Sequence, residues 1–174
     1  QVPPHALNVH LHGGTVLPGL TSYGSTLGLS DVPSESSASN GQDPSLLTRH
    51  LYLDTKRLVP RAEDGLIFGG HALRRAHASG VTTAVNVPAT IGMFGGVSTH
   101  FDTGARTVLD AHSVRTSEVA LHVRLAYPIN DHEPSLATQL ALLRSLLRNP
   151  PPGSVEWHRV SRGEWPLVVK TNAQ

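Results

Sequence analysis

Cysteine is absent from the 174 residues of this chain. Its absence excludes disulfide bonds, thiolate catalysis and cysteine-based zinc sites. The chain also lacks an excess of charge of either sign, because 14 basic residues stand against 13 acidic ones and no basic cluster is longer than Arg74-Arg75. Nucleic acids and anionic membranes attract basic patches, so we expect neither as a partner.

Long apolar runs are missing as well. No stretch reaches the roughly 20 apolar residues that cross a bilayer, and the N-terminal residues show neither the basic nor the apolar block of a signal peptide. We therefore expect no membrane span in this segment. The sequence also has no Asn-x-Ser/Thr site, P-loop, dinucleotide fingerprint or nucleophile elbow. These absences do not indicate in which cellular compartment the protein works. They also give no support to a nucleotide-binding protein or to a hydrolase with a nucleophile elbow.

The residues that are present alternate between helical and strand patterns. Residues 66–79 place apolar side chains near helical spacing, and Gly80 follows at the position that commonly ends a helix. Residues 81–87 are rich in β-branched side chains and end at Pro88, which is typical of a strand. The same alternation predicts helices at 107–111 and 133–148 and strands at 120–127 and 167–170. It indicates an α/β fold with parallel strands.

Two short strands are expected before this alternation. Residues 6–12 alternate apolar and polar side chains with a period of two, which is typical of a half-buried strand. Residues 15–20 contain a second short β-prone run, and the serine-rich residues 30–45 have loop composition. The chain begins with Gln1 and ends just after an apolar β-prone run. We therefore expect it to be part of a longer polypeptide.

Four segments together carry a resemblance to a known family. They are GGTVLPGL with LGL (13–20 and 27–29), HALRRAHASGVTTAVNVPA (71–89), GGVSTHFDTGA (95–105) and ALHVR (120–124). In their order and spacing they resemble the amidohydrolase superfamily, specifically the imidazolonepropionase-like branch that includes proteins labelled carbohydrate esterase family 9. This resemblance implies a (β/α)₈ TIM-like barrel beside a small β-sandwich, with hydrolysis of C–N (amide or cyclic amide) or ester bonds.

The resemblance also implies how the chain would be divided. A barrel of this kind needs about 250 residues, so residues 1–17 would supply sandwich strands and residues 18–174 the first half of the barrel. The remainder of the barrel would come from the same or another polypeptide, and a homo-oligomer is expected.

The resemblance implies a divalent, zinc-like metal, but the sequence departs from the family at the first metal-binding motif. Members carry His-x-His on the first barrel strand, where alternate residues point to one face and two imidazoles can bind one ion. Here Gly24, Ser25 and Thr26 occupy these three positions. Neither a missing side chain at Gly24 nor the hydroxyl of Thr26 replaces an imidazole ligand. The motif therefore predicts altered or lost metal binding.

Other places in the sequence offer side chains that could bind a metal. His10 and His12 have His-x-His spacing but lie upstream of PGL, so we interpret them as alternate residues of a strand, with an adventitious metal site as the alternative. Lys170 ends a predicted strand, where a carbamylated lysine bridges metals in some amidohydrolases. It is a weak candidate, as is His122, which alternates with Arg124 along ALHVR.

His100 and Asp102 are the candidate substrate-binding residues, because they lie in a Gly-rich segment after a predicted barrel strand, where barrel chemistry is usually found. The alternative is a structural turn. His71 and His77 are interpreted as surface histidines of the predicted helix, since a spacing of six does not bring them onto one face.

The side chains of Asp131, His132 and Glu133 are of types that bind metal ions, but Asn130-Asp131 is also a good helix cap. We favour the cap. No catalytic residue can be assigned.

Two functions follow from these observations. The first is an amidohydrolase-like hydrolase of amide, cyclic amide or ester bonds that is divergent at its first metal-binding motif. The second is a catalytically inactive protein of the same fold with a binding or assembly role, which Gly24 and Thr26 suggest.

Overall fold

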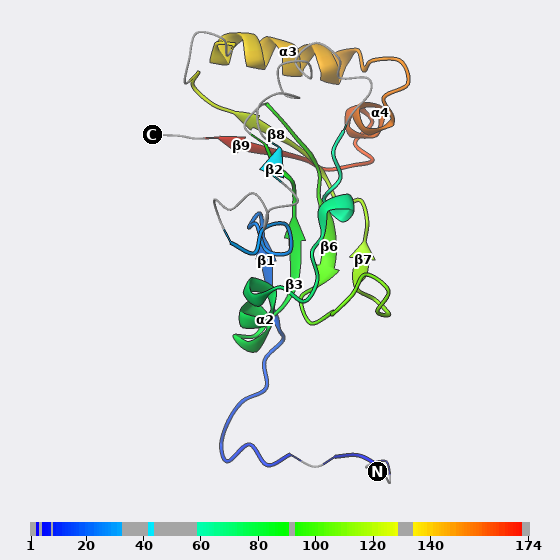
Figure 1. The fold of residues 1–174 in the computed structure, drawn as a ribbon. Coiled ribbons are helices and arrows are strands. Elements are labelled where there is room, and N and C mark those ends of the chain that lie inside the picture. The colour runs from blue at the N-terminus through cyan, green and yellow to red at the C-terminus, as the bar shows by residue number, and fades with distance from the viewer. Residues whose placement is uncertain are drawn as a thin grey trace.

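The computed structural model of the chain describes residues 3, 5–7, 9–32, 42–43, 59–90, 93–128 and 134–171. In this part of the chain the strands form one sheet of four strands, one of three, and a short two-stranded pairing (Figure 1). The short pairing joins β2 (Gln42–Asp43) to β4 (Ala89–Thr90) in parallel. The fold is of mixed α/β type.

The four-stranded sheet has the order β1 (Leu20–Tyr23), β3 (Val81–Asn86), β6 (Thr99–Asp102), β7 (Val114–Thr116). Strands β1 and β3 run parallel, whereas the pairs β3–β6 and β6–β7 are antiparallel. Helix α2 (His71–Ala78) packs against this sheet. Its buried Leu73 forms a small apolar cluster with Ala84 of β3 and Phe101 of β6.

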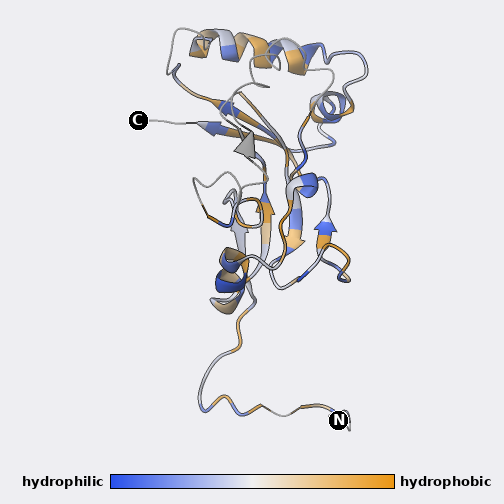
Figure 2. Cartoon of the chain, viewed as in Figure 1, coloured by the Kyte–Doolittle hydropathy of each residue, from blue (hydrophilic) through white to orange (hydrophobic). Residues whose placement is uncertain are grey.

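The three-stranded sheet has the order β5 (Phe94–Val97), β8 (Leu121–Leu125), β9 (Leu167–Thr171). Strands β8 and β9 are parallel, and β5 is antiparallel to β8. Helices α3 (Leu136–Arg148) and α4 (Val155–Ser161) lie on this sheet. Hydrophobic and hydrophilic residues alternate along α3 (Figure 2), and its Leu143 joins Val123 and Trp157 in the larger apolar core.

The chain crosses from one sheet to the other at Ser98, which lies between β5 and β6. The buried Ser98 donates its N–H to the carbonyl of Ala120 at 3.0 Å and accepts from the N–H of Val119 at 2.9 Å. Just before it, Gly96 has a φ of 95°, and a Cβ there would lie 2.3 Å from the carbonyl oxygen of Pro60. Only glycine fits this crossing, because a side chain would collide with backbone.

The later predicted elements are largely confirmed. Each of the predicted elements from residue 66 onward, apart from the helix at 107–111, has a counterpart in the structure. These counterparts are α2, β3, β8, α3 and β9, and each lies within its predicted range or differs from it by a few residues at one end. Helix α3 begins at Leu136 and its cap is Ser135, whose hydroxyl accepts from the N–H of Thr138 at 3.3 Å. The predicted cap at Asn130-Asp131 was wrong for this helix, and those residues lie outside the described part of the chain.

The expected parallel strands are present as the pairs β1–β3 and β8–β9, but antiparallel pairs occur beside them. Strands β5, β6 and β7 enter by antiparallel pairing in a segment whose glycines suggested a connection. The sequence also gave no expectation of helix α4. The described strands do not show the predicted barrel, so that part of the expectation stays a prediction.

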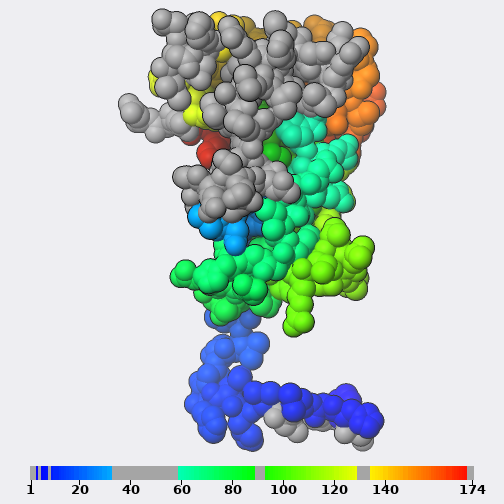
Figure 3. Space-filling model, in the orientation of Figure 1, coloured from blue at the N-terminus to red at the C-terminus, as the bar shows by residue number. Residues whose placement is uncertain are grey.

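Two local expectations were also wrong, and a third stays a prediction. The described residues of 6–12 form no strand here, because the N-terminal segment stands away from the rest of the chain (Figure 3), and a strand there would need partners that the described residues do not supply. The second strand begins at Leu20 rather than at residue 15. Residues 107–111 form turns instead of a helix, since the Asp110 carboxylate accepts from the N–H groups of Arg106 and Thr107. Most of the predicted loop at 30–45 lies outside the described residues.

Candidate functional site

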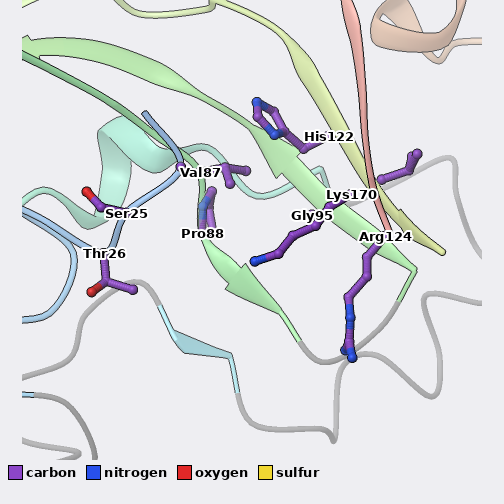
Figure 4. Close-up of a pocket in the computed structure, with 10 residues that line it drawn as sticks. Ser25, Thr26, Val87, Pro88, Gly95, His122, Arg124 and Lys170 are labelled. Carbon is purple, nitrogen blue, oxygen red and sulfur yellow. The ribbon is translucent and has the colours of Figure 1, made fainter. Parts of the chain in front are cut away.

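A cavity of about 290 Å³ lies where the two larger sheets approach each other. Its lining comes from the turn after β1, the residues after β3, and strands β5, β8 and β9: Gly24, Ser25, Thr26, Val87, Pro88, Gly95, His122, Val123, Arg124 and Lys170. In Figure 4, Ser25 and Thr26 lie across the cavity from Arg124 and Lys170. The cavity therefore lies near the carboxyl ends of parallel strands, the usual position for ligand binding in α/β proteins.

The turn after β1 is held in place by a hydrogen-bond network around Ser25. Its hydroxyl accepts from Ser22 Oγ at 2.8 Å and donates to Asn86 Oδ1 at 3.2 Å. Asn86 is fully buried at the end of β3, and its side-chain amide donates to the carbonyl of Leu27. An amide oxygen does not act as a general base, so this network makes Ser25 a structural residue rather than an activated nucleophile.

Gly24 leads into this turn with a left-handed φ of 69°. Its N–H donates to the carbonyl of Val85 at 2.9 Å, and a Cβ at this position would have nothing within 4 Å. Space for a side chain therefore exists, but a non-glycine residue would be strained by about 1–2 kcal/mol in this backbone conformation. The position that carries the first family histidine is thus shaped for glycine in this chain.

His122 lies beneath the cavity on β8, where its side chain is largely buried with 8% of its surface exposed. Its ring lies 6.2 Å from that of Tyr23, which ends β1. The Nε2 atom is buried and has no hydrogen-bond partner among the described residues. Burial lowers the pKa of His122 from its ordinary 6.5 to about 4, so the imidazole is neutral near pH 7.

Arg124 and Lys170 are register partners on the adjacent parallel strands β8 and β9. Because alternate residues of a strand share a face, Arg124 lies on the same face of β8 as His122. Both cationic residues therefore start from neighbouring positions of the sheet, and both line the cavity. No aspartate or glutamate occurs among the lining residues that the structure describes.

His100 and Asp102 share one face of β6 but are not among the residues that line the cavity. Burial raises the pKa of Asp102, but the hydrogen bond from the Gly104 amide and the Arg115 guanidinium at 3.0 Å outweigh it, so the pKa is lowered. The pKa of His100 is lowered by burial and by Arg115. Strand pairing and this ion pair account for the local geometry, and a substrate-binding role for the two residues stays a prediction.

The other histidine candidates do not assemble into a metal site. No group of three His, Asp or Glu side chains that could hold a metal occurs in the part of the chain that the structure describes. The rings of His10 and His12 lie 6.2 Å apart on the exposed N-terminal segment. His71 and His77 are exposed on α2, as predicted, and His77 Nδ1 lies 3.1 Å from Thr103 Oγ1.

The cluster Asp131, His132 and Glu133 lies outside the described residues. None of the helices in the described ranges has the length and apolar character needed to cross a membrane.

The structure thus brings together three features that the sequence marked separately: the Gly24–Thr26 turn, His122 and Lys170. Sequence reasoning missed the contribution of Val87, Pro88 and Gly95. A signal for the first two exists, because residues that directly follow a parallel strand commonly line the ligand site. Nothing local in the sequence marks Gly95, which faces the backbone and Cβ of His122 through strand pairing.

The mixed α/β fold has a counterpart among solved structures. The structure is similar to that of an amidohydrolase from Thermotoga maritima MSB8, with a TM-score of 0.57 and 20% identity, over 94% of this chain and 37% of that one. At this identity the likeness concerns the fold alone.

In sequence, the chain is 35% identical over 150 residues to the amidohydrolase tasK of Hapsidospora irregularis. The alignment covers 81% of this chain and 13% of that protein, so the chain spans a small part of its relative's length. No protein-family model matches the chain.

Proposed function

We propose that this chain forms part of the active site of a hydrolase that cleaves amide-type C–N bonds or esters. The observation that carries the proposal is the cavity at the carboxyl ends of β1, β3, β8 and β9, with a buried neutral imidazole and two cations in its lining. The similarity to two amidohydrolases supports the same reaction class.

The finer architecture is part of this proposal. The parallel pairs β1–β3 and β8–β9 would be the first strands of a TIM-like barrel of the imidazolonepropionase-like branch, with residues 1–17 flanking it as sandwich strands. The remaining strands would come from the same or another polypeptide in a homo-oligomer. Exposed apolar side chains on the N-terminal segment, among them Leu7, Val16 and Leu17, support this arrangement, because they would be covered by such strands.

The described lining does not fit a complete divalent metal centre. It offers one imidazole, His122, with glycine and threonine at the positions where two more would be needed. A catalytic zinc site takes three protein ligands and keeps a position open. A zinc-like metal would therefore need ligands beyond the described residues, and we derive no step of the reaction through it.

The role of His122 in the proposed reaction follows from its Nε2 atom, which has no hydrogen-bond partner among the described residues. A buried nitrogen without a hydrogen bond is costly to the fold, and a ligand in the cavity can satisfy it. We propose that Nε2 of the neutral imidazole makes a hydrogen bond to the bound amide and positions the bond to be cleaved. The hydrogen bond between Ser25 and Asn86 would hold the turn after β1, which forms the opposite wall of the cavity, in its conformation.

The test is hydrolysis of a panel of N-acyl amino acids, cyclic amides and esters by the natural polypeptide, together with its metal content. We expect turnover, and we expect His122→Phe to lower kcat/KM by about 10- to 100-fold while His122→Gln, which keeps hydrogen-bonding groups, loses less. Absence of turnover of every substrate in the panel, with and without added divalent metal, would overturn the proposal.

A second function is favoured by one observation, the left-handed glycine at the first position of the family's metal motif. In this alternative the fold is catalytically inactive and serves binding or assembly. Turnover of any amide or ester by the unaltered natural polypeptide excludes it.

A further inference from the structure

His122 is buried although the helices of its sheet lie on the other face. Leu143 of α3 and Trp157 of α4 share one apolar core with Val123, the neighbour of His122 along β8. Because successive side chains of a strand point to opposite faces, His122 lies on the face that these helices leave uncovered. The residue is nevertheless only 8% exposed. Other parts of the chain must therefore cover the imidazole.

Part of this cover comes from Tyr23, the last residue of β1 in the four-stranded sheet. The rings of Tyr23 and His122 lie 6.2 Å apart, with an angle of 31° between their planes. This distance is within the range of offset aromatic pairs. Tyr23 itself is 57% exposed. Its ring thus contacts the imidazole on one side and is open to solvent elsewhere, which is the position of a cover.

The backbone fixes the place of the Tyr23 ring. Tyr23 is the register partner of Val85 on β3, and the N–H of the following Gly24 donates to the Val85 carbonyl at 2.9 Å. Val85 is itself buried, so β1 ends against a well-packed strand. Side chains on such rigid elements are held more precisely than side chains on loops.

Burial, and not a neighbouring charge, sets the protonation of His122. Among the described strands packed around it, β8 and β9 carry one charged side chain each, Arg124 and Lys170, whereas β1 and β5 carry none. In Figure 4 the imidazole points away from the Arg124 guanidinium. Burial lowers the pKa of His122 to about 4. Removing a side chain that buries the ring should therefore change its protonation.

We infer that Tyr23 is a positioning residue of the proposed hydrolase, whose ring keeps water from the His122 imidazole and holds it in place for the bound amide. This inference rests on the proposed function, because it adds a residue to the same cavity. Tyr23 is not among the residues that line the cavity. It therefore acts through His122 and does not touch the substrate.

The first measurement needs no substrate. Exchange of the imidazole Cε1–H with deuterium, followed against pH in the natural polypeptide, gives the pKa of a single histidine by mass spectrometry. Cleavage after arginine releases residues 116–124, in which His122 is the one histidine. We expect the pKa of His122 to rise from about 4 toward its ordinary 6.5 in Tyr23→Ala. Tyr23→Phe, which keeps the ring, should leave it unchanged.

The second measurement is kcat/KM on the best amide of the panel, at pH 8 and at pH 5.5. In Tyr23→Ala we expect a loss of about threefold at pH 8 and a further severalfold loss at pH 5.5, where more of the imidazole is protonated. Tyr23→Phe should stay within about twofold of wild type at both values. A merely structural role would lower kcat/KM by the same factor at both pH values.

The matched control is Tyr127→Ala, which removes a tyrosine that is also largely exposed but lies outside the ring contact with His122. It should change neither the pKa of His122 nor the pH dependence of kcat/KM. Tyr23→Leu, which keeps apolar bulk, decides the question if Tyr23→Ala does not fold. The inference is overturned if the pKa of His122 is unchanged without the ring, or if Tyr23→Phe loses as much as Tyr23→Ala.

The two proposals fail in different ways. Turnover of an amide or ester, together with an unchanged pKa of His122 in Tyr23→Ala, overturns this inference and supports the hydrolase. A raised pKa in that variant without turnover of any substrate supports Tyr23 as the cover of His122 and overturns the hydrolase.

Discussion

His122 makes the stability of the fold sensitive to acid. Its pKa is about 4 in the folded protein and about 6.5 in an unfolded chain. Between these values the unfolded chain binds a proton that the folded chain does not, so the free energy of unfolding falls as pH drops from about 6.5 to 4. Because some solvent reaches the ring, we expect a loss of about 1–2 kcal/mol rather than the full value of the shift.

Urea unfolding at a series of pH values checks this expectation in wild-type protein and in His122→Gln, which cannot titrate. The other histidines are common to both proteins, so the difference between the two curves isolates this residue. The difference should change between pH 7.5 and 4.5 in favour of the variant at low pH. A constant difference would contradict the burial of a neutral imidazole.

At the scale of single residues, the sequence marked several members of the site but not their contacts. Gly24, Thr26, His122 and Lys170 could be singled out by motif and position. The bond between Ser25 and Asn86 could not, because it joins residues 61 positions apart. Such contacts depend on tertiary packing, which a local pattern does not contain.

An ion network joins three segments of the chain around Glu118, which lies just before β8. Its carboxylate accepts from Arg61 at 2.5 Å and from Arg159 of α4 at 2.8 Å. The Arg159 guanidinium also lies 4.2 Å from the ring centre of Trp165. Networks of partly buried charges contribute more than isolated surface pairs, so we expect Glu118→Gln to lower the free energy of unfolding by about 1–2 kcal/mol.

Thermal or urea unfolding measures the loss, and Glu164→Gln is the matched control. Glu164 pairs with Arg162 at 3.8 Å, with both side chains more than half exposed, so its change should stay within about 0.5 kcal/mol. High salt should reduce the difference between the two variants. Equal effects of both substitutions would show that the network adds nothing beyond ordinary surface pairs.

At the scale of elements, the sequence predicted the end of α2 but not its start. Gly80 follows the helix as expected. Its first N–H groups, those of His71 and Ala72, donate to the carboxylate of Asp31, about 40 residues away in sequence. These hydrogen bonds lower the pKa of Asp31. A cap supplied from a distant residue leaves no signal at the helix itself, so the predicted helix began too early.

At the scale of the whole molecule, the alternation of helix and strand predicted an α/β fold with parallel strands, and such strands are present in the pairs β1–β3 and β8–β9. It did not predict that β5 and β6 enter different sheets on either side of Ser98. The glycines at 95 and 96 indicate a connection when read locally. Their structural reason is the close approach of His122 and Pro60, which only the assembled sheets create.

The cavity connects the two larger sheets, since β1 and β3 lead into one wall and β5, β8 and β9 form the other. A ligand that binds only the folded state raises the free energy of opening of the segments that it contacts. An N-acetyl amino acid bound there should therefore slow amide hydrogen exchange in β3 and β8 together, although the two strands belong to separate sheets with separate apolar clusters. Exchange measured by mass spectrometry, with and without the ligand, resolves the two segments. In His122→Phe both effects should shrink together, because both depend on the same bound molecule. Protection confined to one sheet would place the ligand outside the cavity.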